Sequence, residues 1–346
     1  MPDDPAKKKT AKEQRGSKEA EGGGEKGASS TRRRRYTRTP SSGPLLLSAE
    51  HMLVLRFLAE CRFLSLPQVA RLIGVPEKGT RRRLRILFDA GLVDVVPVSR
   101  VALAPTDAPN DSSLLFGSAP NIYALTASGS KASSKEWTAG GGAGHKTPTY
   151  GPKNGLFLAH ELAVRDVRVW LEGVRRATGP GPQVGRWQVG QEAWIEVGEP
   201  ANRASVRPDA WFAYELNGGA RPVVLVGLAE IDRGTERGDR HWWAKMNGYR
   251  RLFEEQEALT AATGYVNARV LVFTPNVQQR DRLAATLVDL VQQANLPYEF
   301  LSHFWLAEHA VLSGDDLAAP VWRRPGVSSL LPLVSPKVLA SARSEG

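Results

Sequence analysis

Cysteine, long apolar runs and an apolar N-terminal segment are scarce or missing in this chain. Cys61 is the only cysteine among 346 residues, which excludes a disulfide within the chain and argues against a cysteine-based zinc site. No run approaches the roughly 18 apolar residues of a membrane-spanning helix, and the N-terminus has no apolar signal core. We therefore expect a cytoplasmic protein with no membrane partner.

The first 43 residues also lack the large apolar side chains that a core requires. They carry 12 Lys and Arg against six Asp and Glu, a net charge of +6 within a whole-chain charge of +10. We expect residues 1–43 to form a disordered basic arm that binds polyanions by releasing their counterions. Its densest part holds the predicted DNA-binding residues Arg32, Arg33, Arg34 and Arg35. The alternative is a solubilising tail with no fixed partner.

Residues 44–130 show the element order of a winged helix-turn-helix domain. Apolar residues recur three and four apart, Ser65 predicts the start of a short helix, and Gly74 predicts its end. A third helix is predicted over residues 80–90, and the segments LVDVVPV and NIYALTASG after it are predicted to form a hairpin with a long tip. In such a domain the third helix enters the major groove of DNA.

The third predicted helix is strongly basic. Leu84, Leu87 and Phe88 form its inner stripe, and four arginines lie near its start or on its outer side: Arg81, Arg82, Arg83 and Arg85. We interpret these four as DNA-binding residues, which makes double-stranded DNA the expected partner. The alternative is a three-helix protein-interaction domain with a solvated basic face.

A second domain is predicted after a linker. Residues 131–153 are rich in Gly, Ser and Thr, which indicates a linker. Residues 154–312 then predict a helix, three strands, a helix, a strand, a helix and a last strand. This order favours an α+β or α/β domain with a mixed sheet flanked by helices. We expect residues 313–346 to be loosely ordered.

Three acids are predicted to converge at one edge of that sheet. Glu230 and Asp232 end the apolar strand VVLVGLAEID and, being two apart, share a face. Asp209 begins the preceding strand, so an antiparallel hairpin brings all three together. Three carboxylates suit Mg²⁺ (or Mn²⁺), which assists phosphodiester chemistry. The alternative is an exposed strand end whose acids pair with Arg207, Arg233 or Arg237.

Four neighbouring side chains are candidates for the same site. Lys245 lies on the packed side of a predicted helix and therefore needs an anionic partner, either the acids or a phosphate. His160 either hydrogen-bonds one of the acids or is a satisfied core residue. Glu161, at the edge of the same apolar stripe, is a candidate fourth oxygen donor. Tyr249 fits a core aromatic better than a covalent nucleophile.

These residues resemble a known family. The segments RPDAWF and AEIDRGTE, with Lys245 and with LAHELAVRDVRVWL on the first helix of the second domain, are similar to the replication-relaxation family of plasmid and mobile-element proteins. The resemblance covers residues 45–310, and His160 matches a family histidine. It implies a winged helix followed by a restriction-endonuclease-like domain. Some members resemble relaxases that nick DNA at a transfer origin.

The resemblance implies a Mg²⁺-dependent DNA nickase or relaxase acting at a plasmid origin, with replication or conjugation proteins as further partners. Its catalytic residues would be Asp209, Glu230, Asp232 and Lys245. One departure stands out, because the nuclease signature has a lysine two positions after the glutamate and this chain has Asp232 there. Lys245 would then supply the amine from the following helix. The alternative is a non-catalytic transcriptional regulator or replication accessory factor whose second domain is a structural or homodimerisation unit.

Overall fold

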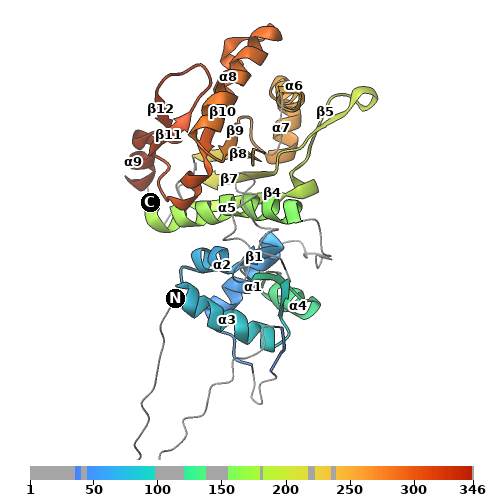
Figure 1. Cartoon of the computed structure of the whole chain (residues 1–346), viewed down its shortest axis with the longest axis vertical. Coiled ribbons are helices and arrows are strands. Elements are labelled where there is room, and N and C mark those ends of the chain that lie inside the picture. Colours follow the sequence, from blue (N-terminus) through green and yellow to red (C-terminus); the bar gives the residue numbers. More distant parts are fainter. Residues whose placement is uncertain are drawn as a thin grey trace, which may run out of the picture. The chain divides into compact units, whose positions relative to one another are not determined.

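A computed structural model describes residues 36–39, 45–96, 98, 121–137, 155–179, 182–216, 223–234 and 239–344. All elements below belong to the second of two units, Arg38–Gly346 (Figure 1). Most of the predicted basic arm, including Arg32, Arg33, Arg34 and Arg35, lies outside the described residues. Within its described part, Arg38 donates to the Phe88 carbonyl at 2.9 Å and pairs with Asp94. Among the helices of the described part, none is long and apolar enough to cross a membrane.

The first part of the fold is a helical module, residues 45–137. Its elements are α1 (Ala49–Cys61), β1 (Phe63–Ser65), α2 (Leu66–Ile73), α3 (Glu77–Asp89), β2 (Val93–Val96), β3 (Ile122–Leu125) and α4 (Ala127–Trp137). The three strands form an antiparallel sheet in the order β1-β3-β2. Residues 131–137, predicted as linker, instead continue α4, in which Ala132 packs against the core of the module and Ser133 is buried.

Local signals fix the α2–α3 corner. The Ser65 hydroxyl accepts from the backbone of Gln68, whose side chain accepts from the backbone of Ser65, so two of the unpaired amides at the start of α2 are satisfied. Gly74 ends α2 in the left-handed region at φ 69°. The inner stripe Leu84, Leu87 and Phe88 is buried as predicted. The helix therefore directs its other side toward solvent.

The second part is a seven-stranded mixed sheet in the order β12-β11-β10-β9-β8-β7-β4, in which β8, β9 and β10 are parallel and the other neighbours antiparallel. Its first half comprises α5 (Gly155–Thr178), β4 (Gln183–Val189), η4 (Gly190–Ala193), β5 (Ile195–Val197), η5 (Pro200–Asn202), β6 (Ala204–Val206), β7 (Ala210–Glu215) and β8 (Val224–Ile231). The mixed sheet flanked by helices is confirmed. The sequence segments predicted as two long strands are each divided, because β5 and β6 form a separate hairpin.

The second half adds helices and two edge strands. It comprises α6 (Asp239–Glu254), α7 (Gln256–Thr263), β9 (Arg269–Thr274), α8 (Val277–Gln293), η6 (Tyr298–His303), β10 (Phe304–Glu308), η7 (His309–Ser313), β11 (Pro320–Arg323), β12 (Leu330–Pro332) and α9 (Pro336–Ser344). The prediction that residues 313–346 are loosely ordered was wrong for the described part of that segment. Trp322 and Leu333, exposed by 0% and 1%, complete the core beside β10.

Each face of the sheet has its own core. Because side chains alternate along β7 and β8, Phe212 and Ala229 pack in the core with α5, and Trp211 and Leu228 pack in the core with α6, α7 and α8. Figure 1 shows α5 on the other side of the sheet from α6, α7 and α8. Gly227 pairs with Phe212, and a Cβ at Gly227 would lie 2.4 Å from the Phe212 ring. A bulkier residue there would displace the ring, which explains the glycine inside a buried strand.

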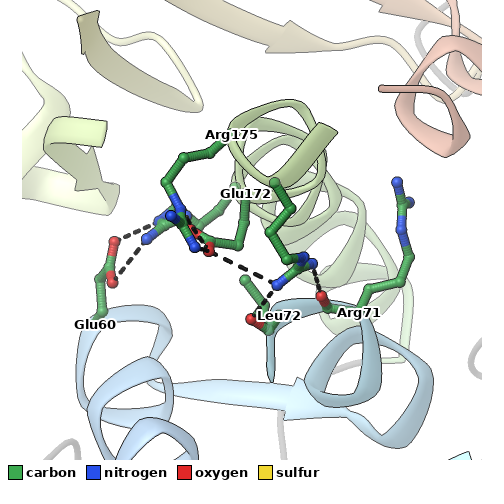
Figure 2. Close-up of polar contacts among 7 residues, drawn as sticks. Glu60, Arg71, Leu72, Glu172 and Arg175 are labelled. Atoms are coloured by element: carbon green, nitrogen blue, oxygen red, sulfur yellow. Dashed lines mark hydrogen bonds and ion pairs between the residues drawn. The ribbon is translucent and has the colours of Figure 1, made fainter. Parts of the chain in front are cut away.

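Helix α5 packs on both the sheet and the helical module. Its module side carries charge: the Arg168 guanidinium donates to Glu60 at 2.5 Å and pairs with Glu172 at 3.4 Å (Figure 2). Arg175 pairs with Glu172 at 2.7 Å, and Arg176 donates to the carbonyls of Leu72, at 2.7 Å, and Arg71. We call Glu60, Arg168, Glu172, Arg175 and Arg176 the arginine network.

Candidate functional site

The pairing of β7 with β8 places two of the predicted acids opposite each other. Asp209 directly precedes β7, whose first residue, Ala210, pairs with Ala229 of β8. Continuing this register puts Asp209 opposite Glu230. The backbone of Asp209 donates to the Ala229 carbonyl at 3.0 Å, and the Ile231 amide donates to the Asp209 carboxylate at 2.7 Å. The strand pairing thus fixes the Asp209 side chain at the end of β8.

Glu230 is 1% exposed and is held by two donors from α6. The Lys245 ammonium donates to one carboxylate oxygen at 2.8 Å, and the Tyr249 hydroxyl donates to the other at 2.5 Å. Burial, together with the charge of Asp209, raises the pKa of Glu230 despite the opposing effect of Lys245. Lys245 therefore has the anionic partner that its position predicts.

Tyr249 is part of the packed core. Its side chain lies among the residues between α6 and the sheet and is 1% exposed. Burial and the neighbouring Glu230 raise the pKa of its hydroxyl well above the ordinary value. A hydroxyl sealed in this way and already donating to Glu230 does not suit a covalent nucleophile, in agreement with its interpretation as a core aromatic.

His160 joins the site from α5. Its Nε2 lies 3.0 Å from Oδ1 of Asp209. Burial alone would lower the pKa of His160, but the hydrogen bond and charge of Asp209 outweigh it and raise the pKa. For Asp209 burial is likewise outweighed, by His160, Lys245 and the Ile231 amide, so its pKa is lowered. We call His160, Asp209, Glu230, Lys245 and Tyr249 the acid cluster.

Asp232 has other hydrogen-bond partners. Its carboxylate accepts from the Gly234 amide at 2.7 Å and from the Gln279 side chain on α8 at 2.9 Å. Glu161, predicted as a further oxygen donor, pairs instead with Arg165, whose guanidinium also donates to the Cys61 carbonyl at 3.0 Å. The structure therefore joins Asp209, Glu230, Lys245 and His160 by close contacts, whereas the hydrogen bonds of Asp232 and the ion pair of Glu161 go to other partners.

The predicted Mg²⁺ site does not fit this arrangement. Each of the six oxygens of Asp209, Glu230 and Asp232 already accepts a hydrogen bond from a side chain or a backbone amide. Among the described residues, no three His, Cys, Asp or Glu side chains form a group that could hold a metal ion. The carboxylates that were predicted to bind a shared cation are instead hydrogen-bonded by nearby donors, among which Lys245 carries a positive charge.

Two polar residues beside Asp232 were missed from the sequence. Gln279 lies in the first turn of α8, and His309 follows β10 with Nε2 3.0 Å from the Phe273 carbonyl. Burial lowers the pKa of His309, while the charge of Asp232 opposes that shift. Both follow the carboxyl ends of parallel strands, where open α/β sheets bind ligands. Gln279 and His309 could therefore have been predicted as site residues if the sequence had shown that β9 and β10 are parallel.

The four arginines of α3 divide into two pairs. Arg81 is 64% exposed by side chain, with a loose 3.9 Å ion pair to Glu77, and Arg82 is exposed. The side chains of Arg83 and Arg85 are only 27% and 25% exposed. Arg83 donates to the Gly79 carbonyl at 3.2 Å and pairs with Glu50, and Arg85 pairs with Asp89 at 2.8 Å. Arg81 and Arg82 are thus the two most available to a partner.

Comparison with known proteins gives one informative match. No curated protein matches the chain. The solved structure of the restriction endonuclease FokI aligns at 10% identity and a TM-score of 0.25, over 77% of this chain and 43% of that one, a similarity too weak to support any conclusion. The model of the replication-relaxation family matches residues 55–267, which is more than half of the sequence and includes α3 and the acid cluster. The chain therefore belongs to the replication-relaxation family.

Proposed function

We propose that this chain is a DNA-binding protein of a plasmid or integrated mobile element, and that its helical module is a winged helix-turn-helix domain. The order α1-β1-α2-α3-β2-β3, with three antiparallel strands, supports this assignment. The wing would be the β2–β3 hairpin, whose tip lies mostly outside the described residues. In this arrangement α3 enters the major groove of a duplex.

The observation that carries the proposal is the exposed basic side of α3. Leu84 and Leu87, both 0% exposed, anchor the helix, while Arg81 and Arg82 extend into solvent near its N-terminus. The first turns of a recognition helix face the bases and flanking phosphates. Arg83 instead pairs with Glu50 of α1, and Arg85 pairs with Asp89 within α3, so these two arginines already have acidic partners.

The test is a fluorescence-polarisation titration of a labelled 30-bp duplex at several salt concentrations. Arg81→Gln combined with Arg82→Gln removes two charges from α3. The control, Arg250→Gln with Arg282→Gln, removes two from α6 and α8. If both α3 arginines contact phosphates, the first variant lowers the slope of log affinity against log salt by about 1.8, at about 0.9 per contact. Equal slopes for the wild type and both variants would refute the proposed role of α3.

A second candidate function is DNA nicking, which the acid cluster favours. Asp209, Glu230, Lys245 and His160 come from four separate elements and meet where β8 ends. Lys245 and protonated His160 supply positive charge for a phosphodiester, and Asp209 and Glu230 are proton acceptors. The arrangement does not fit Mg²⁺, so no metal-dependent step is assigned.

The nicking candidate is tested on supercoiled plasmid carrying the element's own origin, with Mg²⁺, with Mn²⁺ and with a chelator. We expect open circles from the wild type and from the control Glu254→Gln, and none from Asp209→Asn, Glu230→Gln or Lys245→Met. If the wild type leaves the plasmid supercoiled in all three buffers, the protein is better explained as a non-catalytic regulator or replication accessory factor.

A further inference from the structure

An exposed tryptophan lies on the β5–β6 hairpin, and the chain after β6 leads directly to Asp209 of the acid cluster. Trp194 precedes β5 and is 38% exposed. The Arg207 guanidinium lies 4.3 Å from the centre of its ring. We call Trp194 and Arg207 the stacking pair. An aromatic ring with a planar cation on it offers the type of surface on which unpaired bases stack.

The hairpin fixes both members of the pair. Ile195 pairs with Val206, so Trp194 and Arg207 extend the same antiparallel register by one residue. Trp194 stands between Ala193 and Ile195, which are 0% and 1% exposed. Buried neighbours on both sides anchor the backbone and direct the Trp194 ring outward. A platform held this way loses little conformational entropy when a ligand binds.

The charge around the stacking pair suits a polyanion. Arg207 is itself exposed, and Arg203 is exposed four residues earlier, just before β6. Arg62, at the end of α1, pairs loosely at 3.8 Å with Glu192 in the turn before Trp194. Glu196, two residues after Trp194 in β5, is a second exposed acid. The three arginines Arg62, Arg203 and Arg207 outnumber these two acids, which leaves a net positive charge for backbone phosphates.

The chain path places the pair beside the acid cluster. Only buried Pro208 separates Arg207 from Asp209, so their Cα atoms lie at most about 7 Å apart. Asp209 in turn contacts His160 and lies opposite Glu230. A strand whose base stacks on Trp194 would pass its next phosphate close to Asp209, Lys245 and His160.

We propose that Trp194 and Arg207 bind unpaired bases of single-stranded DNA and guide that strand to the acid cluster. The inference rests on the proposed function for the class of ligand, DNA, but it concerns a surface that duplex binding by α3 does not use. The base would stack on the indole ring, and Arg207 would contact the ring and the adjacent phosphate. Such stacking tolerates any sequence because every base has a π-face.

The test uses the full chain and a fluorescein-labelled 20-nucleotide oligo-dT, read by polarisation. Trp194→Ala should weaken binding about tenfold or more, because the loss of one base stack costs about that factor in affinity. Trp194→Phe keeps an aromatic ring and should retain most of the affinity. Arg207→Gln should lower the salt slope by about 0.7, the value for one single-strand phosphate. The control Tyr298→Ala removes another exposed aromatic, 51% exposed on η6, and should bind as the wild type does.

A second measurement uses the wild type, so its result does not depend on whether the variants fold. Oligo-dT carrying 5-iodouracil is cross-linked to the wild type by light, and the linked peptide is identified by mass spectrometry. A cross-link to Trp194 supports the proposal. Cross-links confined to other segments, equal oligo-dT affinity of the wild type and Trp194→Ala, or tighter binding of oligo-U than oligo-dT would each overturn it.

The two proposals fail separately. Arg81→Gln with Arg82→Gln should weaken binding of the 30-bp duplex and leave oligo-dT affinity within about twofold, whereas Trp194→Ala should do the reverse. Loss of the duplex effect alone would remove the proposed role of α3. Loss of the oligo-dT effect alone would remove the stacking pair.

Discussion

The arginine network and the acid cluster are both partly buried groups of opposite charges, yet they differ in their cations. In the arginine network every cation is an arginine, which stays charged at any ordinary pH. In the acid cluster the cations are Lys245 and His160, which lose protons more readily. The first group has fixed charges and joins two parts of the fold, whereas the second contains a histidine whose pKa Asp209 raises. Burial and ion pairing alone do not distinguish a structural group from a functional one.

The pKa shifts support the same distinction. Within the acid cluster, the pKa of Glu230 is raised and that of Asp209 is lowered, although the two are opposite each other at one strand pairing. Two neighbouring carboxylates with opposite shifts are typical of sites that need both a proton acceptor and a fixed negative charge. Ionised Glu230 therefore carries a desolvation cost.

Breaking the arginine network should have the largest effect on stability. Arg168→Met leaves the buried carboxylates of Glu60 and Glu172 without their shared cation, and its side chain is only 5% exposed. Removing one partner of a buried pair costs about 3–5 kcal/mol. We expect that loss in the free energy of unfolding, measured by urea denaturation. The control Arg250→Met breaks an exposed pair with Glu254 and should cost less than about 1 kcal/mol.

Removing the lysine of the acid cluster should cost less. Lys245→Met takes the ammonium from buried Glu230, but the raised pKa of that carboxyl makes its protonation easier. We expect a loss of about 1–3 kcal/mol at pH 7.5, of the size of an unsatisfied buried acceptor, and a smaller loss at pH 5. Denaturation at both pH values measures it. A pH-independent loss as large as that of Arg168→Met would remove the proposed distinction.

Asp166 adds one titratable group to the contact between α5 and the module. Burial raises its pKa to about 6, while the Gln68 side chain donates to it at 2.8 Å. A raised folded-state pKa means that its stability contribution is complete below the unfolded value of about 3.9 and is lost as pH rises through about 6. We expect Asp166→Asn to raise the melting temperature relative to the wild type at pH 7.5 and not at pH 4. The same difference at both pH values would contradict this assignment.

Local features were predictable from the sequence, and several long-range contacts were not. The start of α2 at Ser65 and its end at Gly74 could be predicted, because helix caps depend on a few adjacent residues. The buried strand ending in Glu230, and the need of Lys245 for an anion, followed from periodicity. The hydrogen bond between Gln279 and Asp232 could not be predicted in this way, because the two residues are 47 positions apart. The short strands β11 and β12 have too few residues to show a period.

The arginines of α3 show the same difference between local and long-range contacts. Their clustering near the start of a helix predicted a basic surface, and Arg81 and Arg82 are exposed as that surface requires. The pairing of Arg85 with Asp89 follows the four-residue spacing of a helix and was open to prediction. The pairing of Arg83 with Glu50 joins α3 to α1 and depends on how the two helices pack.

The unfolding free energy of Glu230→Gln at pH 7.5 tests most directly the claim that the acid cluster serves function more than stability. Glutamine keeps the shape, and its amide oxygen can accept from Lys245 while its NH₂ group donates to the Tyr249 hydroxyl oxygen; the change removes a buried charge whose pKa is raised. We predict a free energy of unfolding within about 1 kcal/mol of the wild type, or above it, because functional groups are often held at a cost to stability. A loss of about 3 kcal/mol or more, equal to that of Arg168→Met, would show that the acid cluster is structural and contradict the claim.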